Sequence, residues 1–492
     1  MRHTSLIAIL LITALVPAAQ AATITVDWRG GADYETIQGG LDAAGDGDEV
    51  LVADGTYSGP DNTELDFHGK SIHLRRSGTG EVLIDCEQSA RAFLFDDGED
   101  ELAIVDGLTV VNGASSTGGA IRIVDASPTI TNCTIESCTA DERGGGIRVV
   151  RGHPVIDSCV FIQNHAVEGG AIAVEDGAVT IRHCSFSSNE GDDLGGALLL
   201  DGTTVVVQDC SFTRNETSTS YGDETSAGGA VHILGSQADF ISCDFEQNVA
   251  RKGGAISLRR PSSVSLSACS FYANRAGTYT SIGSGYGAAV HMYGCSPTIS
   301  ECYFERNEPT GGGTIWGEYS SPVLDYCTFF SNKGALETDI GHDIELYHTD
   351  IDNAVIENCT FCGWRMNGSR DEGALLRFGD CEPLVEGCII AFYNYGPGVT
   401  CIGTGQPTIR ECIVFGNTGG DEICGTDPSN NLSTDPLFCG FWEGDLTLCA
   451  NSPCLPPYNP WGILIGAHDA GCESCDTPVE RTSWGTIKAM YR

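Results

Sequence analysis

Short runs of alternating apolar and polar residues fill most of this chain and recur with a period of about 25 residues. Each period holds three runs, of the forms V-x-I, C-x-F and G-G-A-I-x-V, separated by Asn, Gly or charged residues. Alternation with a period of two predicts β-strands that bury one face. We therefore expect a chain of short strands, three to each repeat.

Two motifs mark the repeat. The first, G-G-A-(I/L/V), stands at Gly118–Ile121, Gly169–Ile172, Gly195–Leu198, Gly228–Val231 and Gly253–Ile256, with looser copies at Gly144–Ile147, Gly287–Val290 and Gly312–Ile315. The second, C-x-F-x-x-N, begins at Cys159, Cys184, Cys210, Cys243, Cys269, Cys302 and Cys327. Successive cysteines from Cys133 to Cys327 are 26, 25, 26, 33, 26, 33 and 25 residues apart, so two repeats carry insertions.

Strands that repeat in this way without helices between them can satisfy their hydrogen bonds only by pairing with their copies in the next repeat. The sequence thus predicts an all-β fold, a single right-handed parallel β-helix with three sheets, in which each coil rises by about 4.8 Å. The Asn of the second motif is expected at a bend, where its amide can bond the same amide in the next coil and adopt a left-handed backbone. The paired glycines are expected at another corner, because they allow positive φ and close backbone approach.

The 23 cysteines fall into two groups. Eleven occupy one coil position and should form a buried ladder of free thiols, because stacked strands hold them slightly too far apart for relaxed disulfides: Cys133, Cys159, Cys184, Cys210, Cys243, Cys269, Cys302, Cys327, Cys359, Cys388 and Cys412. Others crowd the C-terminal end and predict a disulfide-stapled cap: Cys401, Cys424, Cys439, Cys449, Cys454, Cys472 and Cys475.

The expected organisation is a signal peptide over residues 1–21, an N-terminal strand and helix cap over 22–62, the β-helix over 63–424, the Cys-rich cap over 425–476 and a tail over 477–492. In the N-terminal cap, Tyr34, Ile37 and Leu41 share a helical face, with Asp33 as the expected N-cap. No later apolar run reaches the roughly 20 residues that span a bilayer. We therefore expect an exported protein, extracellular or at the cell surface.

A net charge of -41 disfavours nucleic acid as a partner, because it repels phosphate backbones. The charge is typical of a solvated acidic surface, although calcium remains a cofactor that the sequence allows. No other cofactor is expected, and we expect a monomer.

The paired G-G-A-(I/L/V) and F-x-x-N motifs over residues 118–332 resemble the repeats of the polymorphic outer-membrane protein family of adhesins. The N-terminal stretch, with Asp33–Gln38, Gly47–Val52 and Gly55–Tyr57, is similar to the opening of pectin-lyase-like β-helix proteins. The first resemblance implies a surface-exposed β-helix and an adhesive role. The second implies the fold and leaves the activity open, because such folds carry lyases, hydrolases, esterases and non-catalytic members.

The G-G-A-I run points to a binding face. The residue after its inward aliphatic should face outward, which gives a row with His232, His291 and Trp316; Arg259, Tyr293 and Glu318 lie two positions further on. The two insertions add Tyr221 and Tyr279 on loops beside this face. Aromatic and imidazole groups in a groove are typical of sugar-ring stacking. His232 and His291 stand two coils apart, too far to share one metal ion.

Catalysis would need carboxylates that converge from adjacent coils. Asp192 and Asp193 are the candidate pair, but neighbouring acids in a corner sequence are more typical of solvated turns. The leading hypothesis is therefore non-catalytic adhesion or glycan binding, with an extracellular glycan or a neighbouring cell surface as partner. A polysaccharide lyase or glycoside hydrolase and a structural surface protein are the alternatives.

Overall fold

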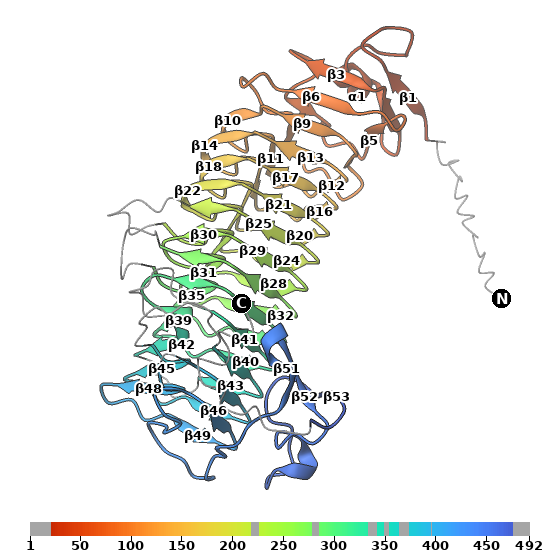
Figure 1. Cartoon of the computed structure of the whole chain (residues 1–492). Helices are drawn as coiled ribbons and strands as arrows, with labels where there is room; N and C mark the ends of the chain where they lie inside the picture. The colour runs from red at the N-terminus through yellow and green to blue at the C-terminus, as the bar shows by residue number, and fades with distance from the viewer. Residues whose placement is uncertain are drawn as a thin grey trace, which may run out of the picture.

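A computed structural model describes residues 21–217, 226–277, 285–332, 342–348, 354–363, 373–394 and 396–475. These residues form one elongated parallel β-helix with the N-terminal coils at one end and the C-terminal segment beside the other (Figure 1). Three long sheets run the length of the solenoid, so the predicted all-β architecture with three sheets is confirmed. The described residues also form a fourth, shorter sheet of eight strands, which the sequence analysis did not predict.

The V-x-I runs build a fifteen-stranded sheet. Its strands, in spatial order, are β1 (Thr23–Val26), β2 (Glu49–Val52), β5 (His73–Arg76), β8 (Ile104–Asp106), β12 (Thr129–Thr131), β16 (Val155–Asp157), β20 (Ala178–Arg182), β24 (Thr204–Gln208), β28 (Gln237–Ile241), β32 (Ser263–Ser267), β36 (Thr298–Ser300), β40 (Val323–Asp325), β43 (Val355–Glu357), β46 (Leu384–Glu386) and β49 (Thr408–Arg410).

The C-x-F runs build a fourteen-stranded sheet. Its strands are β3 (Gly55–Ser58), β6 (Val82–Asp85), β9 (Thr109–Val111), β13 (Thr134–Glu136), β17 (Val160–Ile162), β21 (Ser185–Ser187), β25 (Ser211–Thr213), β29 (Asp244–Glu246), β33 (Ser270–Tyr272), β37 (Tyr303–Glu305), β41 (Thr328–Phe330), β44 (Thr360–Cys362), β47 (Ile389–Ala391) and β50 (Ile413–Phe415).

The G-G-A-I runs build a thirteen-stranded sheet. Its strands are β4 (Leu65–Asp66), β7 (Phe93–Phe95), β11 (Ile121–Val124), β15 (Ile147–Val150), β19 (Ile172–Glu175), β23 (Leu198–Asp201), β27 (Val231–Leu234), β31 (Ile256–Arg259), β35 (Val290–Tyr293), β39 (Gly313–Glu318), β42 (His342–Tyr347), β45 (Leu376–Gly379) and β48 (Val399–Ile402).

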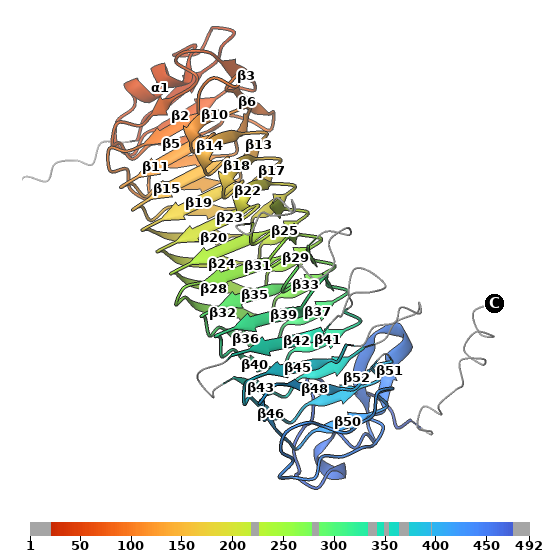
Figure 2. The same cartoon turned by 90° about the vertical axis from the view of Figure 1, so that its left-hand side faces the viewer.

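The eight-stranded sheet lies between the second and third runs of each coil (Figure 2). Its strands are β10 (Ala114–Thr117), β14 (Thr139–Arg143), β18 (His165–Glu168), β22 (Glu190–Leu194), β26 (Glu216–Thr217), β30 (Val249–Ala250), β34 (Arg275–Ala276) and β38 (Glu308–Pro309). The residues after the bend Asn therefore continue the parallel pairing before the chain reaches the paired glycines.

Stacks of identical residues fill the core. The rings of Phe161, Phe186 and Phe212 stack at centroid distances of 4.9 and 4.7 Å, and the stack continues through later coils to Phe361. Beside it runs the predicted asparagine ladder, in which Nδ2 of Asn189 donates to Oδ1 of Asn215 at 3.0 Å, and so on from coil to coil. These amides are fully buried, so the ladder satisfies polar groups that would otherwise destabilise the core.

The corner geometry corrects one detail of the prediction. The left-handed residue is the one before each ladder Asn, such as Ser188 at φ 54° and Arg214 at φ 53°, and not the Asn itself. The glycine pair behaves as expected. Gly195 has φ +64°, and a Cβ on Gly196 would lie 2.1 Å from the carbonyl oxygen of Gly229 in the next coil.

All eleven cysteines of the predicted ladder are buried and free. The C-terminal staples are Cys401–Cys424, Cys439–Cys472 and Cys449–Cys475. Cys454 was expected to join them but is free and buried, because its side chain belongs to a small apolar core of the C-terminal segment.

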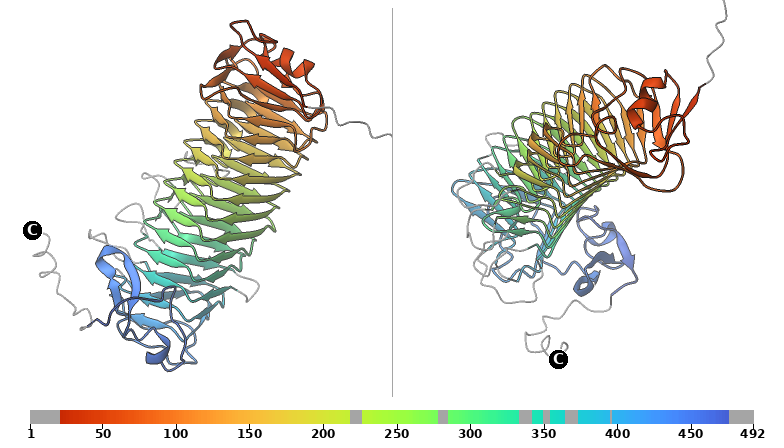
Figure 3. Two further views of the ribbon diagram at one scale, coloured as in Figure 1. Left: turned by 90° about the vertical axis from the view of Figure 1, so that its right-hand side faces the viewer. Right: turned by 90° about the horizontal axis from the view of Figure 1, so that it is seen from above.

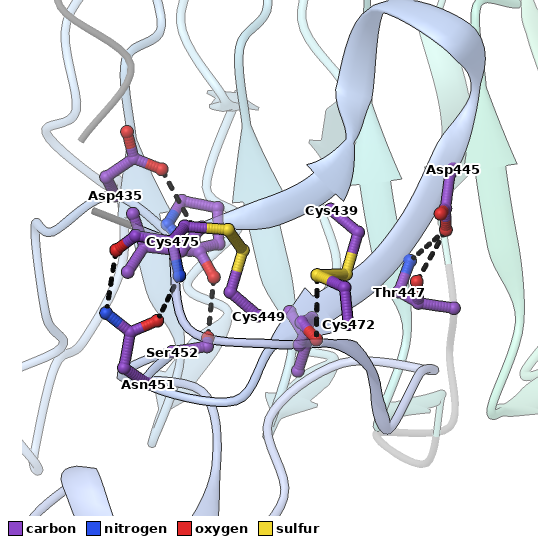
Figure 4. Close-up of a disulfide and its surroundings, with 12 residues drawn as sticks. Asp435, Cys439, Asp445, Thr447, Cys449, Asn451, Ser452, Cys472 and Cys475 are labelled. Carbon is purple, nitrogen blue, oxygen red and sulfur yellow. Dashed lines mark hydrogen bonds between the residues drawn. A yellow bond between two sulfur atoms is a disulfide. The ribbon is translucent and has the colours of Figure 1, made fainter. Parts of the chain in front are cut away.

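The disulfide-held part of the C-terminal segment packs against the side of the solenoid, whereas Thr426 and Leu432 pair in parallel with Thr408 and Ile413 of the last coil. It forms a small sheet of β51 (Phe438–Gly440), β52 (Asp445–Cys449) and β53 (Ala470–Cys472), with 3-10 turns at Phe441–Glu443 and Pro456–Tyr458, and two disulfides hold it together (Figures 3 and 4). Phe441 and Ile465 of this segment pack against Phe330 and Ile389, which lie on the fourteen-stranded sheet. The disulfides predicted for the C-terminal end are therefore confirmed.

The N-terminal end is covered by α1 (Ile37–Ala43), whose Ile37 and Leu41 join the main core. Its N-cap is Thr36 and not Asp33, which instead accepts hydrogen bonds from Thr25. In the part of the chain that the structure describes, no helix is long and apolar enough to cross a membrane.

Candidate functional site

The outward positions of the thirteen-stranded sheet form two parallel rows in strict register. The first row runs through Arg122, Arg148, Ala173, Leu199, His232, Ser257, His291, Trp316, Glu345 and Arg377. The second row includes Leu234, Arg259, Tyr293, Glu318 and Tyr347. The structure thus places the six predicted binding residues of this sheet, from His232 to Glu318, on one face and extends the first row to Glu345 and Arg377.

Part of this face is buried, which the sequence analysis did not expect. His232 and His291 are 1% and 2% exposed. Two residues that follow strands of the eight-stranded sheet lie near this part of the face. Lys252 and Tyr286 pair in register there, and Tyr286 lies 5.1 Å from the ring of Trp316. Burial lowers the pKa of His232 to about 3 and that of His291 well below its usual range, with Lys252 and Arg259 adding to the shift of His291. Both imidazoles are therefore neutral at neutral pH.

The imidazole of His291 stacks on the indole of Trp316, with centroids 5.0 Å apart and planes 7° apart. Its Nδ1 lies 3.4 Å from Oγ of Ser257 in the preceding coil. Trp316 itself is only half-buried, so this stack offers a ligand little more than part of the indole ring.

A buried ion pair continues the first row. Nη1 of Arg377 lies 3.0 Å from Oε1 of Glu345 and 3.2 Å from Nε2 of His342. Glu345 is 2% exposed, and its burial raises its pKa although Arg377 acts in the opposite direction. Burial also lowers the pKa of His342 to about 3, so its neutral ring can accept the hydrogen bond from Arg377. The guanidinium is therefore held in one orientation beside the ring of Tyr347, 5.9 Å away.

The open part of the face is a cluster of three rings, Tyr293, Tyr319 and His348, which we call the ring cluster. Tyr293 and Tyr319 are 48% and 45% exposed, and the His348 side chain is 48% exposed. The two tyrosine rings meet edge to face at 5.6 Å, and the His348 ring lies 5.8 Å from Tyr319. Exposed rings that contact one another in this way present apolar surface to solvent.

Tyr319 and His348 occupy the turn that follows the thirteen-stranded sheet, and both have left-handed backbones, at φ 52° and 47°. The same turn in other coils holds Asp125, Arg151, Asp176, Gly202, Gly235, Arg260, Gly294, Asp380 and Gly403. A bulky aromatic residue is uncommon in this conformation, which favours Gly, Asn and Asp. Tyr319 thus stands in a position that costs backbone energy.

Sequence reasoning missed Tyr319, Tyr347, His348, Glu345 and Arg377. An insertion before β42 removes the paired glycines that marked earlier coils, so the third run could not be aligned by motif. Aligning Ile315–Tyr319 with Ile344–His348 directly, aliphatic to aliphatic, would have found the last two aromatic positions.

Of the remaining predicted residues, Arg259 lies between Leu234 and Tyr293 in the second row, and its Nε is buried without a hydrogen-bond partner. Glu318 lies between Tyr293 and Tyr347 in the same row and is half-buried. Tyr221 and Tyr279 lie outside the described residues.

Asp192 and Asp193 are consecutive residues of β22 in the eight-stranded sheet, at the point where the pairing of β22 with β18 shifts register. Oδ1 of Asp192 lies 3.1 Å from Nε2 of His165. Together with Glu190, these residues offer three metal-ligand atoms that lie within 4.8 Å of one another. All three side chains are exposed or half-exposed. A catalytic role for Asp192 and Asp193 therefore stays a prediction.

The repeating coils match one family of proteins along most of the chain. The model of the family described as "Right handed beta helix region" matches residues 61–238, 119–281 and 224–435. The chain belongs to this family. The match is to the β-helix in general, so the resemblance to polymorphic outer-membrane protein repeats remains a prediction.

Solved structures share the β-helix at low sequence identity. PfbA, a surface adhesin of Streptococcus pneumoniae, is 13% identical with a TM-score of 0.33, over 76% of this chain and 86% of that one. The alginate lyase AlyF-OU02 is 13% identical with a TM-score of 0.42, over 89% and 93%. The receptor-binding tailspike of bacteriophage Det7 is 10% identical with a TM-score of 0.33, over 84% and 78%. No curated protein matches the chain.

Proposed function

We propose that this protein is an exported or cell-surface β-helix that binds glycans without cleaving them, through the ring cluster and the polar groups beside it. The observation that carries the proposal is the exposure of Tyr293, Tyr319 and His348 in one contiguous patch. Sugar rings present an apolar face of C–H groups and a rim of hydroxyls, and aromatic side chains bind that apolar face.

The position of Tyr319 supports a binding role over a structural one. Its ring is 45% exposed, so it adds little to the core, and its backbone is left-handed. Tyr326 shares both features, and what favours a ligand at Tyr319 is its contact with two other exposed rings, Tyr293 and His348.

Polar groups surround the rings. Glu318 precedes Tyr319 in the chain, and Arg377 is held beside Tyr347 by Glu345 and His342. Fixed donors and acceptors next to an aromatic platform are what a saccharide site needs in order to choose among sugars.

The first experiment measures retention of the mature chain on immobilised neutral and acidic polysaccharides, with and without Ca²⁺. Tyr319→Asn should lower the affinity for a retained glycan by about tenfold or more. Tyr326→Asn is the matched control, because Tyr326 is 41% exposed and left-handed at φ 50° but lies at a different corner, before Cys327. Equal effects of the two substitutions, or no retention on any glycan, would overturn the proposal in favour of a structural role or protein adhesion.

Polysaccharide cleavage is the second candidate, and Glu345 is the observation that favours it. Its Oε2 is buried without a hydrogen-bond partner among the described residues, and burial raises its pKa, although Arg377 and Tyr347 act in the opposite direction. The same assay should therefore also measure new reducing and unsaturated chain ends. If the parent protein produces new polysaccharide chain ends and the Glu345→Gln variant does not, catalysis would replace binding as the function.

A further inference from the structure

We infer that the ligand of this site is a linear glycan chain that lies parallel to the solenoid axis and places successive sugar residues on successive coils. The inference rests on the proposed glycan binding and adds the form of the ligand and its direction. It follows from the way the exposed groups repeat along the helix.

Four consecutive coils each contribute one side chain to the exposed strip. Tyr293 ends β35, Tyr319 follows β39, His348 follows β42 and Asp380 follows β45. The last three share one turn position with nearly equal φ values of 52°, 47° and 50°. Tyr319, His348 and Asp380 therefore repeat at one position along the axis, and Tyr293 lies one residue earlier, at the end of its strand.

Backbone pairing keeps that period regular. The N–H groups of Tyr319, His348 and Asp380 donate to the carbonyls of Tyr347, Gly379 and Ile402 at 3.1, 3.1 and 3.2 Å. Neighbouring parallel strands lie about 4.8 Å apart. The ring centroids are spaced similarly, 5.6 and 5.8 Å apart. A pyranose residue in an extended chain is close to one coil in length, so each sugar can meet an equivalent platform.

A ligand lying across the coils would fit less well. Along the strand direction, the ring cluster is followed by the first row. There Trp316 is half-buried and contacts the ring of Tyr286, and His291 is 2% exposed. Exposed side chains therefore continue from coil to coil, whereas the side chains next to them along the strand direction are buried or half-buried. This difference favours an axial ligand.

The strip has an end at each side. The turn position of Tyr319 is occupied by Gly294 in the preceding coil, and that of Asp380 by Gly403 in the following coil. Glycine has no side chain that could contact a ligand. Asp380 accepts hydrogen bonds from the N–H and hydroxyl of Thr404, which orient its carboxylate beside His348, 4.0 Å away. Three rings and one carboxylate on four successive coils correspond to a binding length of about four sugar residues.

The test is calorimetric titration of the full mature chain with cello-oligosaccharides and with oligogalacturonides of two to eight residues. In the series that binds, affinity should rise at least about tenfold between two and four residues and then level off. Tyr293→Ala and His348→Ala, which remove opposite parts of the ring cluster, should each weaken the hexasaccharide more than the disaccharide. Tyr326→Ala should change neither.

The outcomes separate the two proposals. A disaccharide that binds as tightly as a hexasaccharide would overturn the axial arrangement and leave glycan binding intact. Equal losses for the disaccharide and the hexasaccharide in both alanine variants would also overturn it, because all contacts would then lie within one short subsite. Failure of both series to bind, together with no polysaccharide retention, would overturn glycan binding itself.

Discussion

The side-chain amide of Asn332 donates a 3.0 Å hydrogen bond to Oδ1 of Asp343, and this contact ends the buried asparagine ladder. Asp343 is 3% exposed, and its Oδ2 has no hydrogen-bond partner in the part of the chain that the structure describes. Burial raises its pKa to about 8, although the bond from Asn332 acts in the opposite direction. The ladder therefore terminates on a carboxyl group that is largely protonated at neutral pH.

This pKa predicts a stability that depends on pH. An unfolded aspartate has a pKa of about 3.9, so between about pH 4 and pH 8 the folded chain holds a proton that the unfolded chain has lost. The free energy of unfolding should fall as pH rises through that window, by up to about 1.4 kcal/mol per pH unit from this group.

Asp343→Asn should remove that slope, because its amide does not titrate and can still accept the bond from Asn332. Urea unfolding of both chains at pH 5, 6.5 and 8 measures the difference. The same slope in the variant and the parent would show that Asp343 ionises normally.

Tyr319→Asn should not reduce stability. The substitution removes a bulky residue from a left-handed turn and loses only an exposed ring contact, so the free energy of unfolding should stay the same or rise by up to about 1 kcal/mol. Phe212→Ala, which opens a gap in the buried ring stack, should lose about 3–5 kcal/mol in the same thermal and urea experiments. A loss above about 1.5 kcal/mol for the tyrosine would assign it a structural role.

Gly196→Ala should prevent folding or cost well over about 3 kcal/mol, because the new Cβ would lie 2.1 Å from the carbonyl oxygen of Gly229. Gly78→Ala is the control: a Cβ there meets no atom within 4 Å, and its backbone is not left-handed. Its effect should lie within about 1 kcal/mol. Circular dichroism and soluble yield report both, and a stable, well-folded Gly196 variant would contradict the close coil contact.

The thiols should react only after unfolding. Seventeen of the 23 cysteines are free, and all seventeen are buried. An uncharged alkylating reagent should label few of them in the native protein and all seventeen in denaturant without a reductant. Fast native labelling of several thiols would mean that the ladder is open, and fewer than seventeen in denaturant would mean disulfides beyond the three in the structure.

Local repetition explains how far the sequence could predict this fold. The period of about 25 residues, the inward Phe and Cys positions and the Asn and Gly corners all follow from one repeating unit, whose strands can pair only with their own copies. The outward row through His232, His291 and Trp316 could be predicted for the same reason, since strand alternation decides which side chains leave the core.

Only the tertiary structure decided what happens outside that core. Strand alternation cannot reveal that His232 and His291 are buried, or that the disulfide-held C-terminal segment packs against the solenoid's side, because both depend on contacts outside the repeating core. The pairing of Arg377 with Glu345 and the contact of Tyr293 with Tyr319 join side chains from different coils, and neither partner is named by the repeat motif. The sequence by itself therefore determined the solenoid and its rows, and the packing around those rows decided which of their side chains meet solvent.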